Sequence, residues 1–569
     1  MPNEALYKTQ SEDRAKHTAL IIESSARNKV IIAGAGTGKS FTFKELLSTK
    51  SGDNLALTFI NSLARDLQKD LDGLADSYTF HGYCKKLLHS ISVEGINSHF
   101  YYFPKLPKII EADATIMGNG LGRFEEAFHT LCEDARIDFY LERGNYYNAV
   151  GHGDAVYRVL KYFQSGVTSL PSFCQVVVDE YQDFNRLEVT FIEELAKNSP
   201  VLIAGDDDQA IYNFKNASAD YIRSKSHSSD FEKFELPYCS RCTEVIVDAV
   251  HDITSKAQTL GKLSGRIEKN YTCFLPDKEA DSIANPQIIF ASCSTHTTRA
   301  PYISKFIELE VVKIPQAEID NAREKNYPCV LILGPSHYTK QIYTYLKPKF
   351  TNIDYPEAPD KDIYILEGYK ILMRDENSNL GWRIILECSH LKEKVSIIKT
   401  SQDGKKQLIE LLPDNFKKSH LDIVKLLQKI KEGAVLSQAE TQDVIEKCEH
   451  TIDEIKKLLD IELGDEAELP VQDNSVSIKI TTINGSKGLS ANYVFLVGMN
   501  DGDFPRIEQN PTDNEICQFI VGLTRTRKKC YLISNSRFGL VYGKAKSVFI
   551  DWIKLTRSKH IIVNAEYFK

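Results

Sequence analysis

The sequence contains no apolar run long enough to cross a membrane. A spanning helix needs roughly 20 consecutive, mainly apolar residues, and the 569-residue chain, which is 26% charged, offers no such stretch. The segment from Met1 to Arg27 is polar and charged and lacks the apolar core of a secretion signal. We therefore expect a cytoplasmic protein with no membrane partner.

Cysteines spaced like metal ligands are also scarce. Twelve cysteines are scattered along the chain, and the C-x-x-C spacing occurs once, at Cys239 and Cys242. A single pair leaves a zinc or redox site open as an interpretation. Reduced thiols in a cytosolic protein are the simpler interpretation.

Basic residues are not in excess. The chain has 70 Lys and Arg against 78 Asp and Glu, a formal net charge of −8. This balance excludes a uniformly basic coat for nucleic acid but leaves room for a locally basic channel. We find no motif of an appended nuclease, so cleavage of nucleic acid would need a partner. The length is that of three or four domains.

A Gly-rich loop between an expected strand and an expected helix is the most informative motif. The apolar run Val30 to Ile32 leads into it, and a helix-forming stretch follows from Phe41 to Leu47. Glycines let successive N–H groups converge on an anion, and the helix N-terminus adds a favourable dipole. Such a loop cradles nucleotide phosphates, with a Lys on the β- and γ-phosphates and a Ser on Mg²⁺. The candidate residues are Ala33, which replaces the usual first Gly, Gly34, Ala35, Gly36, Thr37, Gly38, Lys39 and Ser40.

Two later apolar strands end in polar residues. Val176 to Val178 runs into Asp179 and Glu180, and Val201 to Ala204 leads towards Gln209. Fully apolar strands are typical of parallel sheets, whose carboxyl ends bind ligands. Asp179 would hold Mg²⁺, Glu180 would orient or deprotonate the attacking water, and Gln209 would sense the γ-phosphate. The alternative for the acidic pair is a solvated turn that caps a strand.

Aromatic and polar side chains follow several of these strands. Tyr212 and Phe214 are two residues apart and precede Lys215, a pattern that suits stacking on single-stranded bases beside a phosphate-binding cation. For each residue taken alone, core packing or capping is the simpler interpretation. The candidates in this half of the chain are Phe59, Asn61, His81, Tyr212 and Phe214.

The second half of the chain carries another α/β unit without a phosphate loop. An expected strand, Val476 to Ile480, runs into a Lys-Gly turn at Lys487, and Arg525 lies in a basic cluster before another strand. Helical patterns dominate residues 91–169 and about 356–470, whereas residues 251–326 show no clear pattern.

A series of short motifs resembles those of superfamily 1A helicases of the UvrD/Rep/PcrA type. The first five are Ala-Gly-Ala-Gly-Thr-Gly-Lys-Ser, Leu-Thr-Phe-Ile-Asn, Thr-Phe-His-Gly, Val-Asp-Glu-Tyr-Gln-Asp and Ala-Gly-Asp-Asp-Asp-Gln-Ala-Ile-Tyr. Ser-Arg-Cys-Thr around Arg241, Thr482 to Leu489 and Val521 to Thr526 complete the series. The resemblance implies an α/β fold class with two RecA-like parallel-sheet cores, 1A and 2A, that bind ATP at their interface. Mainly helical insertions, 1B and 2B, would interrupt the cores. The implied ranges are 1–90 and 171–235 for 1A, 91–170 for 1B, 236–355 and 471–569 for 2A, and 356–470 for 2B.

The resemblance also implies roles for individual residues. Lys39, Asp179, Glu180 and Gln209 would keep the catalytic roles given above, and Ser40 and Asp179 would ligate Mg²⁺. Arg241 and Arg525 would be arginine fingers, which can be worth roughly 10³–10⁵ in rate. Gly488 would belong to the ATP site. The implied DNA contacts are Phe59, Asn61, His81, Tyr212, Phe214, Thr482 and Asn484.

Three positions depart from the family pattern. The first is minor, since the Thr-Phe-His motif continues with Gly82 and Tyr83 where Ser and Leu are commoner. Members usually have Glu, near the ribose, where Ser490 follows Gly488 and Leu489. Family members also carry a Gln at a characteristic distance before the Lys of this loop. Here no Gln stands at that distance before Lys39, and Gln10 lies farther from it. The selectivity for base and sugar is therefore open.

The predicted activity is Mg²⁺-ATP hydrolysis coupled to 3′→5′ movement on single-stranded DNA and to the unwinding of 3′-tailed duplex DNA. The alternative is a DNA-stimulated ATPase subunit that serves a partner nuclease, as in Gabija-type anti-phage systems, and unwinds little by itself. A small-molecule kinase that uses the same phosphate loop is a third hypothesis, against which the motifs around Gln209 and Arg525 speak.

Overall fold

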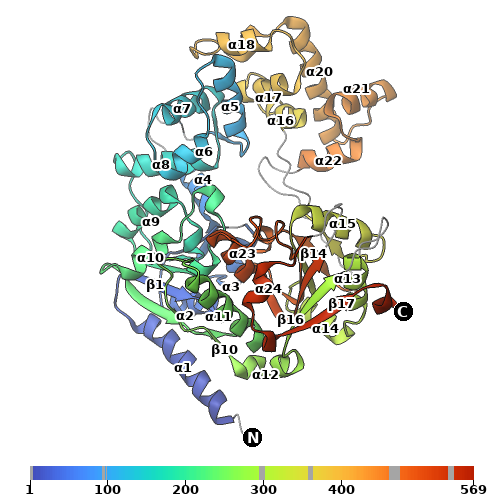
Figure 1. The fold of residues 1–569 in the computed structure, drawn as a ribbon. Helices are drawn as coiled ribbons and strands as arrows, with labels where there is room; N and C mark the ends of the chain where they lie inside the picture. The colour runs from blue at the N-terminus through green and yellow to red at the C-terminus, as the bar shows by residue number, and fades with distance from the viewer. Residues whose placement is uncertain are drawn as a thin grey trace.

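Two parallel β-sheets lie side by side below a layer of helices (Figure 1). The computed structural model describes residues 4–59, 61–91, 97, 99–293, 302–356, 363–460, 475–535 and 544–569. These residues form a mixed α/β molecule, so the predicted fold class with two parallel-sheet cores is confirmed.

The first sheet places three chemically important strand ends next to one another. Its strand order is β3-β2-β6-β7-β1-β8, and every pairing is parallel. Val30, Ile31 and Ile32 of the β1 strand are fully buried, as expected for a strand covered on both faces. Because β1, β7 and β6 are neighbours, the segments that follow them meet at one edge. The strands are β1 (Asn28–Ala33), β2 (Asn54–Thr58), β3 (Asp76–Thr79), β6 (Gln175–Val178), β7 (Val201–Gly205) and β8 (Glu232–Leu236).

Helices cover the first sheet and start next to its strand ends. Thr79 caps one of them, since its Oγ1 accepts a hydrogen bond from the Gly82 N–H at 3.1 Å, and this places His81 in the first turn. The helices are α1 (Glu4–Glu23), α2 (Lys39–Ser48), α3 (Asn61–Asp70), α4 (Phe80–Ser90), α9 (Arg186–Asn198) and α10 (Asp220–His227).

The second sheet has the strand order β13-β14-β12-β15-β16-β11-β17, again with parallel pairing. Three of its strands, β11, β13 and β17, were not predicted from the sequence. The strands are β11 (Ile288–Cys293), β12 (Val330–Leu333), β13 (Ile353–Asp354), β14 (Ile478–Thr481), β15 (Ala491–Val497), β16 (Thr526–Asn535) and β17 (Ser558–Val563). The associated helices are α11 (Glu244–Thr259), α12 (Leu275–Ala284), α13 (Tyr302–Val312), α14 (Gln316–Glu324), α15 (Ser336–Leu346), α23 (Asp513–Leu523) and α24 (Val548–Trp552).

A short parallel pair of strands, β9 (Tyr238–Cys239) and β10 (Thr272–Cys273), lies between the two sheets in the chain order. It follows β8 directly and brings the segment around Arg241 against the phosphate loop, since the Ser240 N–H donates to the Gly36 carbonyl at 3.0 Å. This pair therefore helps to form the boundary between the cores.

The helical layer consists of two groups that contact each other through buried charges. Between the groups, Arg383 Nε lies 2.7 Å from Asp113 Oδ1, and Arg143 Nη1 donates to the Ser401 carbonyl at 3.1 Å. Within the first group, Arg143 Nη2 lies 2.9 Å from Asp113 Oδ2. Figure 1 shows α5 and α7 beside α17 and α18 above the sheets. The first group is α5 (Leu106–Met117), α6 (Phe124–Thr130), α7 (Ala135–Tyr147) and α8 (His152–Gln164), with β4 (Tyr101–Tyr102) and β5 (Ala149–Val150). The second is α16 (Ile365–Leu372), α17 (Asn379–Cys388), α18 (Lys394–Thr400), α19 (Leu408–Leu411), α20 (Asp414–Lys431), α21 (Gln438–Cys448) and α22 (Ile452–Asp460).

The limits predicted for the four domains remain a prediction, and the predicted junction between 2B and the end of 2A falls at residues 461–474, outside the described residues. Among the helices that the structure describes, none combines the length and apolar character needed to span a bilayer.

Candidate nucleotide site and nucleic-acid interface

The phosphate loop connects the end of β1 to the start of α2. Gly38 has a φ of 93° and precedes the first helical residue, Lys39. Gly36 has a φ of 72°, and a Cβ built there would lie 2.4 Å from Arg241 Cβ. Both positions therefore require Gly, one for its backbone conformation and the other also for the close approach of a second segment. The Thr37 hydroxyl closes the turn by donating to the Gly34 carbonyl at 3.0 Å.

Lys39 points at the two acidic residues that follow β6. Its Nζ lies 3.5 Å from Asp179 Oδ1 and 3.3 Å from Glu180 Oε1. Burial disfavours the ammonium group, but the charges of Glu180 and Asp179 outweigh this effect and raise the pKa of Lys39. The three predicted residues are thus brought together, with the Lys charge placed where phosphate would bind.

Glu180 is held in an uncommon backbone conformation. Its φ is 54°, in the left-handed region that non-Gly residues rarely adopt. Burial disfavours its carboxylate, but the charges of Lys39 and Lys487 more than compensate and lower the pKa of Glu180. Gln182 Nε2 donates to Glu180 Oε2 at 2.6 Å. An ionised, oriented carboxylate of this kind can accept a hydrogen bond from a water molecule.

Gln209 connects the two cores. It ends the 3₁₀ turn η2 (Asp207–Gln209), and its Nε2 donates to Asp206 Oδ2 at 2.6 Å. Its Oε1 accepts a 2.9 Å hydrogen bond from Arg525 Nη2, which comes from the segment after α23. The Gln209 amide is therefore oriented by one residue from each core.

The two predicted arginine fingers lie beside this amide and the phosphate loop. Arg525 is buried, and its Nη1 donates to the Leu489 carbonyl at 3.2 Å, next to Gly488. Arg241 Nη1 lies 3.5 Å from the Thr524 carbonyl oxygen. Burial and the neighbouring charge of Arg241 lower the pKa of Arg525 to about 10. Two guanidinium groups that repel each other form a site that an anion would stabilise.

The reasoning from sequence did not assign a role to Lys487, which the structure places at the centre of the site. Its buried Nζ donates to the Gln209 carbonyl at 2.9 Å, contacts Asp183 Oδ2 and lies 3.7 Å from Glu180 Oε2. The available signal was the Lys-Gly turn at the end of an apolar strand. Its partners lie hundreds of positions away in the sequence, so spacing alone could not identify them.

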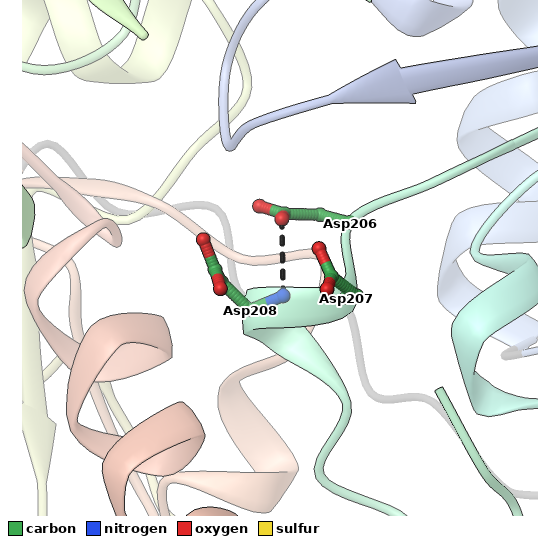
Figure 2. A group of neighbouring side chains, drawn as sticks. All are labelled: Asp206, Asp207 and Asp208. Carbon is green, nitrogen blue, oxygen red and sulfur yellow. Dashed lines mark hydrogen bonds between the residues drawn. The ribbon is translucent and has the colours of Figure 1, made fainter. Parts of the chain in front are cut away.

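Three consecutive aspartates beside the phosphate loop form a compact acidic cluster, Asp206, Asp207 and Asp208 (Figure 2). Their carboxylates lie within metal-ligand distance of one another. Lys269 occupies the position that a cation would take, with Nζ 2.9 Å from Asp207 Oδ1 and 2.8 Å from Asp208 Oδ2 and in contact with Asp206.

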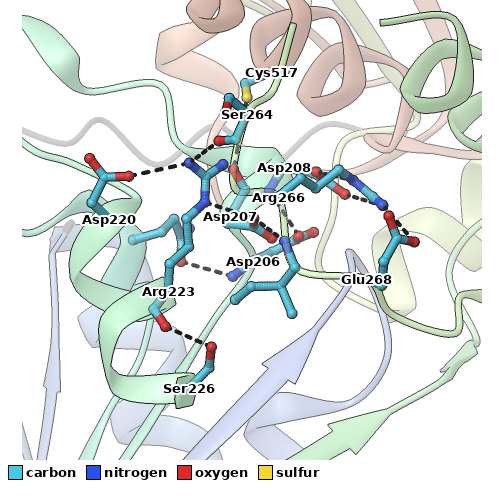
Figure 3. A network of polar contacts seen from close by, with 12 residues as sticks. Asp206, Asp207, Asp208, Asp220, Arg223, Ser226, Ser264, Arg266, Glu268 and Cys517 are labelled. Atoms are coloured by element: carbon cyan, nitrogen blue, oxygen red, sulfur yellow. Dashed lines mark hydrogen bonds and ion pairs between the residues drawn. The ribbon is translucent and has the colours of Figure 1, made fainter. Parts of the chain in front are cut away.

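Two arginines complete the charge balance of this cluster (Figure 3). Arg266 Nε lies 2.7 Å from Asp208 Oδ1, and Arg223 Nε lies 3.1 Å from Asp207 Oδ2. Three buried carboxylates therefore meet three cationic side chains. This network holds the η2 turn, and with it Gln209, against the segment that precedes β10.

Ser40 and Asp179 suit the predicted magnesium site by their chemistry. A hydroxyl and a carboxylate provide the hard oxygen ligands that Mg²⁺ prefers. Ser40 lies in the first turn of α2, and Asp179 directly follows β6, which is separated from β1 by the strand β7. The contact between Asp179 and Lys39, the neighbour of Ser40, brings the two segments together. Asp179 is buried and lies 3.5 Å from Lys39 Nζ, so its carboxylate is placed to ligate a cation beside the phosphates that Lys39 would bind.

Part of the predicted DNA interface forms an aromatic cluster on the first core. The Phe59 ring lies 5.2 Å from the Tyr212 ring and 6.4 Å from the His81 ring, between centroids. Lys215 Nζ lies 4.5 Å from the Phe59 centroid. Phe214 is 67% exposed, whereas Phe59 and Tyr212 are each 9% exposed. Phe214 is thus the ring most open to stacking.

Thr482 and Asn484 line a hollow of about 720 Å³ on the second core. The Tyr212 hydroxyl donates to the Asn484 carbonyl at 3.3 Å, so the hollow adjoins the aromatic cluster. Its other lining residues include Ser336, His337, Arg506 and Gln518, groups that can bind phosphate or base edges. The side chain of Asn61, the remaining predicted contact, lies outside the described part of the chain.

The structure also shows the contacts of Ser490, which stands where the family has Glu, and of Gln10, which lies farther from Lys39 than the family's Gln. Ser490 Oγ accepts a hydrogen bond from Arg527 Nε at 2.9 Å. The Gln10 amide pairs with the backbone before α12, since its Oε1 accepts from the Leu275 N–H at 3.0 Å and its Nε2 donates to the Cys273 carbonyl at 3.4 Å. Both side chains are thus hydrogen-bonded within the chain.

Two family models match parts of this chain. Residues 133–230 match the UvrD/REP helicase N-terminal domain, and residues 266–537 match the UvrD-like helicase C-terminal domain. A probable DNA helicase II homolog of Mycoplasma genitalium is 22% identical over 88% of this chain and 82% of its own length. The ATP-dependent DNA helicase PcrA of Staphylococcus epidermidis is 21% identical over 95% of the chain and 85% of its length, and DNA helicase II of Rickettsia typhi is 23% identical over 94% and 92%.

Proposed function

Because the chain belongs to the UvrD-type superfamily 1 helicases, we propose that it is an ATP-dependent DNA helicase that moves 3′→5′ along single-stranded DNA. Relatives named as ATP-dependent DNA helicases align with most of the chain and support this proposal. The observation that carries it is the Arg525–Gln209 hydrogen bond, which completes one nucleotide site from residues of two cores.

In the proposed reaction the chain's own residues bind and orient the γ-phosphate of ATP. Lys39 exchanges its contacts with Asp179 and Glu180 for phosphate oxygens, and Arg241 and Arg525 neutralise the charge that spreads over the transferred group. Mg²⁺ held by Ser40 and Asp179 would neutralise further phosphate charge. The γ-phosphate would also relieve the repulsion that lowers the pKa of Arg525.

Glu180 and Gln209 act on the attacking water. The ionised carboxylate of Glu180 accepts a hydrogen bond from the water and receives its proton as the new O–P bond forms and the bond from the γ-phosphorus to the bridging oxygen breaks, with ADP as the leaving group. Gln209 responds to the presence of the γ-phosphate, because its side-chain amide hydrogen-bonds to both Asp206 and Arg525. Loss of the γ-phosphate removes the anion between the cores, and we propose that the boundary then opens.

Opening this boundary would move the DNA-binding surfaces. Tyr212 of the first core contacts the Asn484 carbonyl of the second, so a change at the nucleotide site alters the junction between the aromatic cluster and the hollow. Repeated closing and opening would move a bound strand from one surface to the other.

The test combines ATP hydrolysis with strand separation. The purified chain is expected to hydrolyse ATP faster with single-stranded DNA and to separate a duplex with a 3′ tail but not one with a 5′ tail. DNA-stimulated hydrolysis without separation of either duplex would favour the subunit of a nuclease or defence complex. Hydrolysis that ignores DNA would contradict both and favour the small-molecule kinase.

A further inference from the structure

The C-x-x-C pair lies inside the proposed nucleotide site. Cys239 ends β9, Cys242 follows three residues later, and both side chains are fully buried. The Cys242 N–H donates to Cys239 Sγ at 3.4 Å, the turn that brings two such sulfurs together. Arg241, one of the two proposed arginine fingers, stands between them.

The two thiols differ in their surroundings. Burial disfavours the Cys239 thiolate, but hydrogen bonds from the Cys242 thiol and the Tyr271 hydroxyl, which lies 3.3 Å from its sulfur, outweigh this and lower the pKa of Cys239. The hydrogen bond to Cys239, together with burial, raises the pKa of Cys242. The Cys242 thiol lies 3.6 Å from the Thr524 carbonyl oxygen. One thiol is thus suited to attack and the other to resolve.

The pair also touches the phosphate loop. A Cβ built on Gly36 would lie 3.3 Å from Cys239 Sγ, and the Tyr271 hydroxyl also lies 2.9 Å from the Ala35 carbonyl oxygen. We therefore expect the opening that admits a nucleotide phosphate to this loop to be the route by which a small hydroperoxide reaches the buried sulfur.

We propose that Cys239 and Cys242 are a modification site for hydroperoxides, at which a disulfide forms and halts hydrolysis by displacing Arg241. The Cys239 thiolate attacks the peroxide O–O bond, forming a sulfenic acid and releasing hydroxide. Cys242 then attacks the Cys239 sulfur, an S–S bond forms, and the sulfenic oxygen leaves as water with the thiol proton. With hydrogen peroxide, two thiols and one peroxide give one disulfide and two waters.

The disulfide would change the geometry around Arg241. The two sulfurs must approach to about 2 Å, closer than a hydrogen-bonded contact, and the backbone turn that carries Arg241 has to follow. The loss of activity rests on the proposed ATPase function, whereas formation of the disulfide does not.

The experiment treats the reduced full-length chain with hydrogen peroxide, quenches it and alkylates the remaining thiols before peptide mass analysis. The expected peptide containing both Cys239 and Cys242 has lost two hydrogens and resists alkylation, while DNA-stimulated ATPase activity falls about tenfold or more and returns with dithiothreitol. Bound Mg²⁺-ATP analogue is expected to slow the reaction, because it occupies the same loop.

Matched variants decide the assignment. Cys242→Ser is expected to abolish the reversible inhibition, whereas Cys132→Ser and Cys174→Ser, at exposed cysteines, are expected to keep it. Each of three results would overturn the proposal. In the first, Cys239 and Cys242 can still be alkylated in the inhibited protein. In the others, a crosslink forms to the neighbouring Cys273, or the disulfide forms and leaves hydrolysis unchanged. A chain that lacks ATPase activity even when reduced contradicts the proposed function, and the peptide masses still decide whether the disulfide forms.

Discussion

Arg525 Nη2 donates a 2.9 Å hydrogen bond to Gln209 Oε1, which joins a segment of the second core to a turn of the first. The two residues are far apart in the chain, yet each lies at the end of a structural element beside the phosphate loop. The same amide is held by Asp206, and the same arginine faces Arg241. We infer that this hydrogen bond responds both to the separation of the two cores and to the state of the bound nucleotide.

Replacing Arg525 with Ala is expected to reduce the ATPase kcat by roughly 10³-fold or more, because the variant loses a charge that stabilises the transferred phosphoryl group. Nucleotide affinity should fall much less. Steady-state kinetics together with equilibrium binding of a fluorescent ATP analogue measures both effects. Arg323→Ala, on α14 away from the site, is the control. Equal losses of kcat and affinity would make Arg525 a binding residue instead.

The Glu180→Gln variant keeps the size of the side chain but removes the carboxylate that orients water. We expect turnover to fall by about 10²–10⁴-fold with ATP binding retained. A single-turnover assay with labelled ATP, combined with filter binding, separates the two quantities. Hydrolysis near the unmodified rate would remove Glu180 from its proposed role.

Lys487→Met leaves the buried Asp183 carboxylate without its cation. Burial raises the pKa of Asp183 to about 6 even with Lys487 present, so the variant is expected to lose about 3–5 kcal/mol of stability. The double variant Lys487→Met/Asp183→Asn removes the unpaired charge and is expected to regain much of that loss. If Lys487 also serves hydrolysis, the double variant stays inactive although it folds. Thermal unfolding and ATPase assays of both variants provide the comparison, and recovered activity would limit Lys487 to a structural role.

Lys269 is expected to position Gln209 through Asp206. Lys269→Met should lower kcat with little change in KM for ATP, and Lys269→Arg should restore part of the rate because it keeps the charge. Arg223→Gln is the matched control, since Arg223 contacts the cluster at Asp207 rather than at Asp206 and otherwise pairs with Asp220, outside the cluster. Equal kinetic losses in the Lys269 and Arg223 variants would show that the cluster acts through stability alone.

Asp154 gives a prediction of pH dependence. Its side chain is fully buried at the start of α8, where burial raises its pKa to about 7 although Arg158 lies nearby. Because this pKa is above that of the unfolded chain, the folded state holds the extra proton between about pH 4 and 7. The stability that this group contributes is present below about pH 4 and is lost as the pH rises to 7 and above.

Asp154→Asn should therefore reduce the fall in stability between pH 5 and pH 8. Urea unfolding at both pH values measures the difference, with Asp220→Asn, an exposed carboxylate on α10, as the control. A pH dependence that stays unchanged in Asp154→Asn would contradict the raised pKa.

Much of the first core could be predicted from local sequence. The phosphate loop, the acidic pair after β6 and the turn that ends in Gln209 each follow a short apolar strand, so spacing and strand ends were sufficient. The strand β11 was missed although it is an interior strand of the second sheet, between β16 and the edge strand β17. It lies in a stretch without clear periodicity, and its burial comes from strands far away in the sequence.

Ion pairs between residues that are distant in the sequence also could not be predicted from local sequence patterns. Lys487 and Lys269 are ordinary lysines by spacing, and their roles emerge when the fold places them against Asp183 and Asp206. The same holds for Cys239 and Cys242, whose spacing was visible but whose place beside the phosphate loop was not. Packing between distant segments determines these contacts, and no local pattern encodes it.

The measurement that tests the central claim most directly is strand separation by the purified chain on duplexes that differ in the side of the single-stranded tail. The account predicts that ATP and Mg²⁺ drive separation of the 3′-tailed duplex, that the 5′-tailed duplex stays intact, and that Glu180→Gln abolishes the activity. Separation of the 5′-tailed duplex alone, or an equal rate in the Glu180→Gln variant, would contradict it.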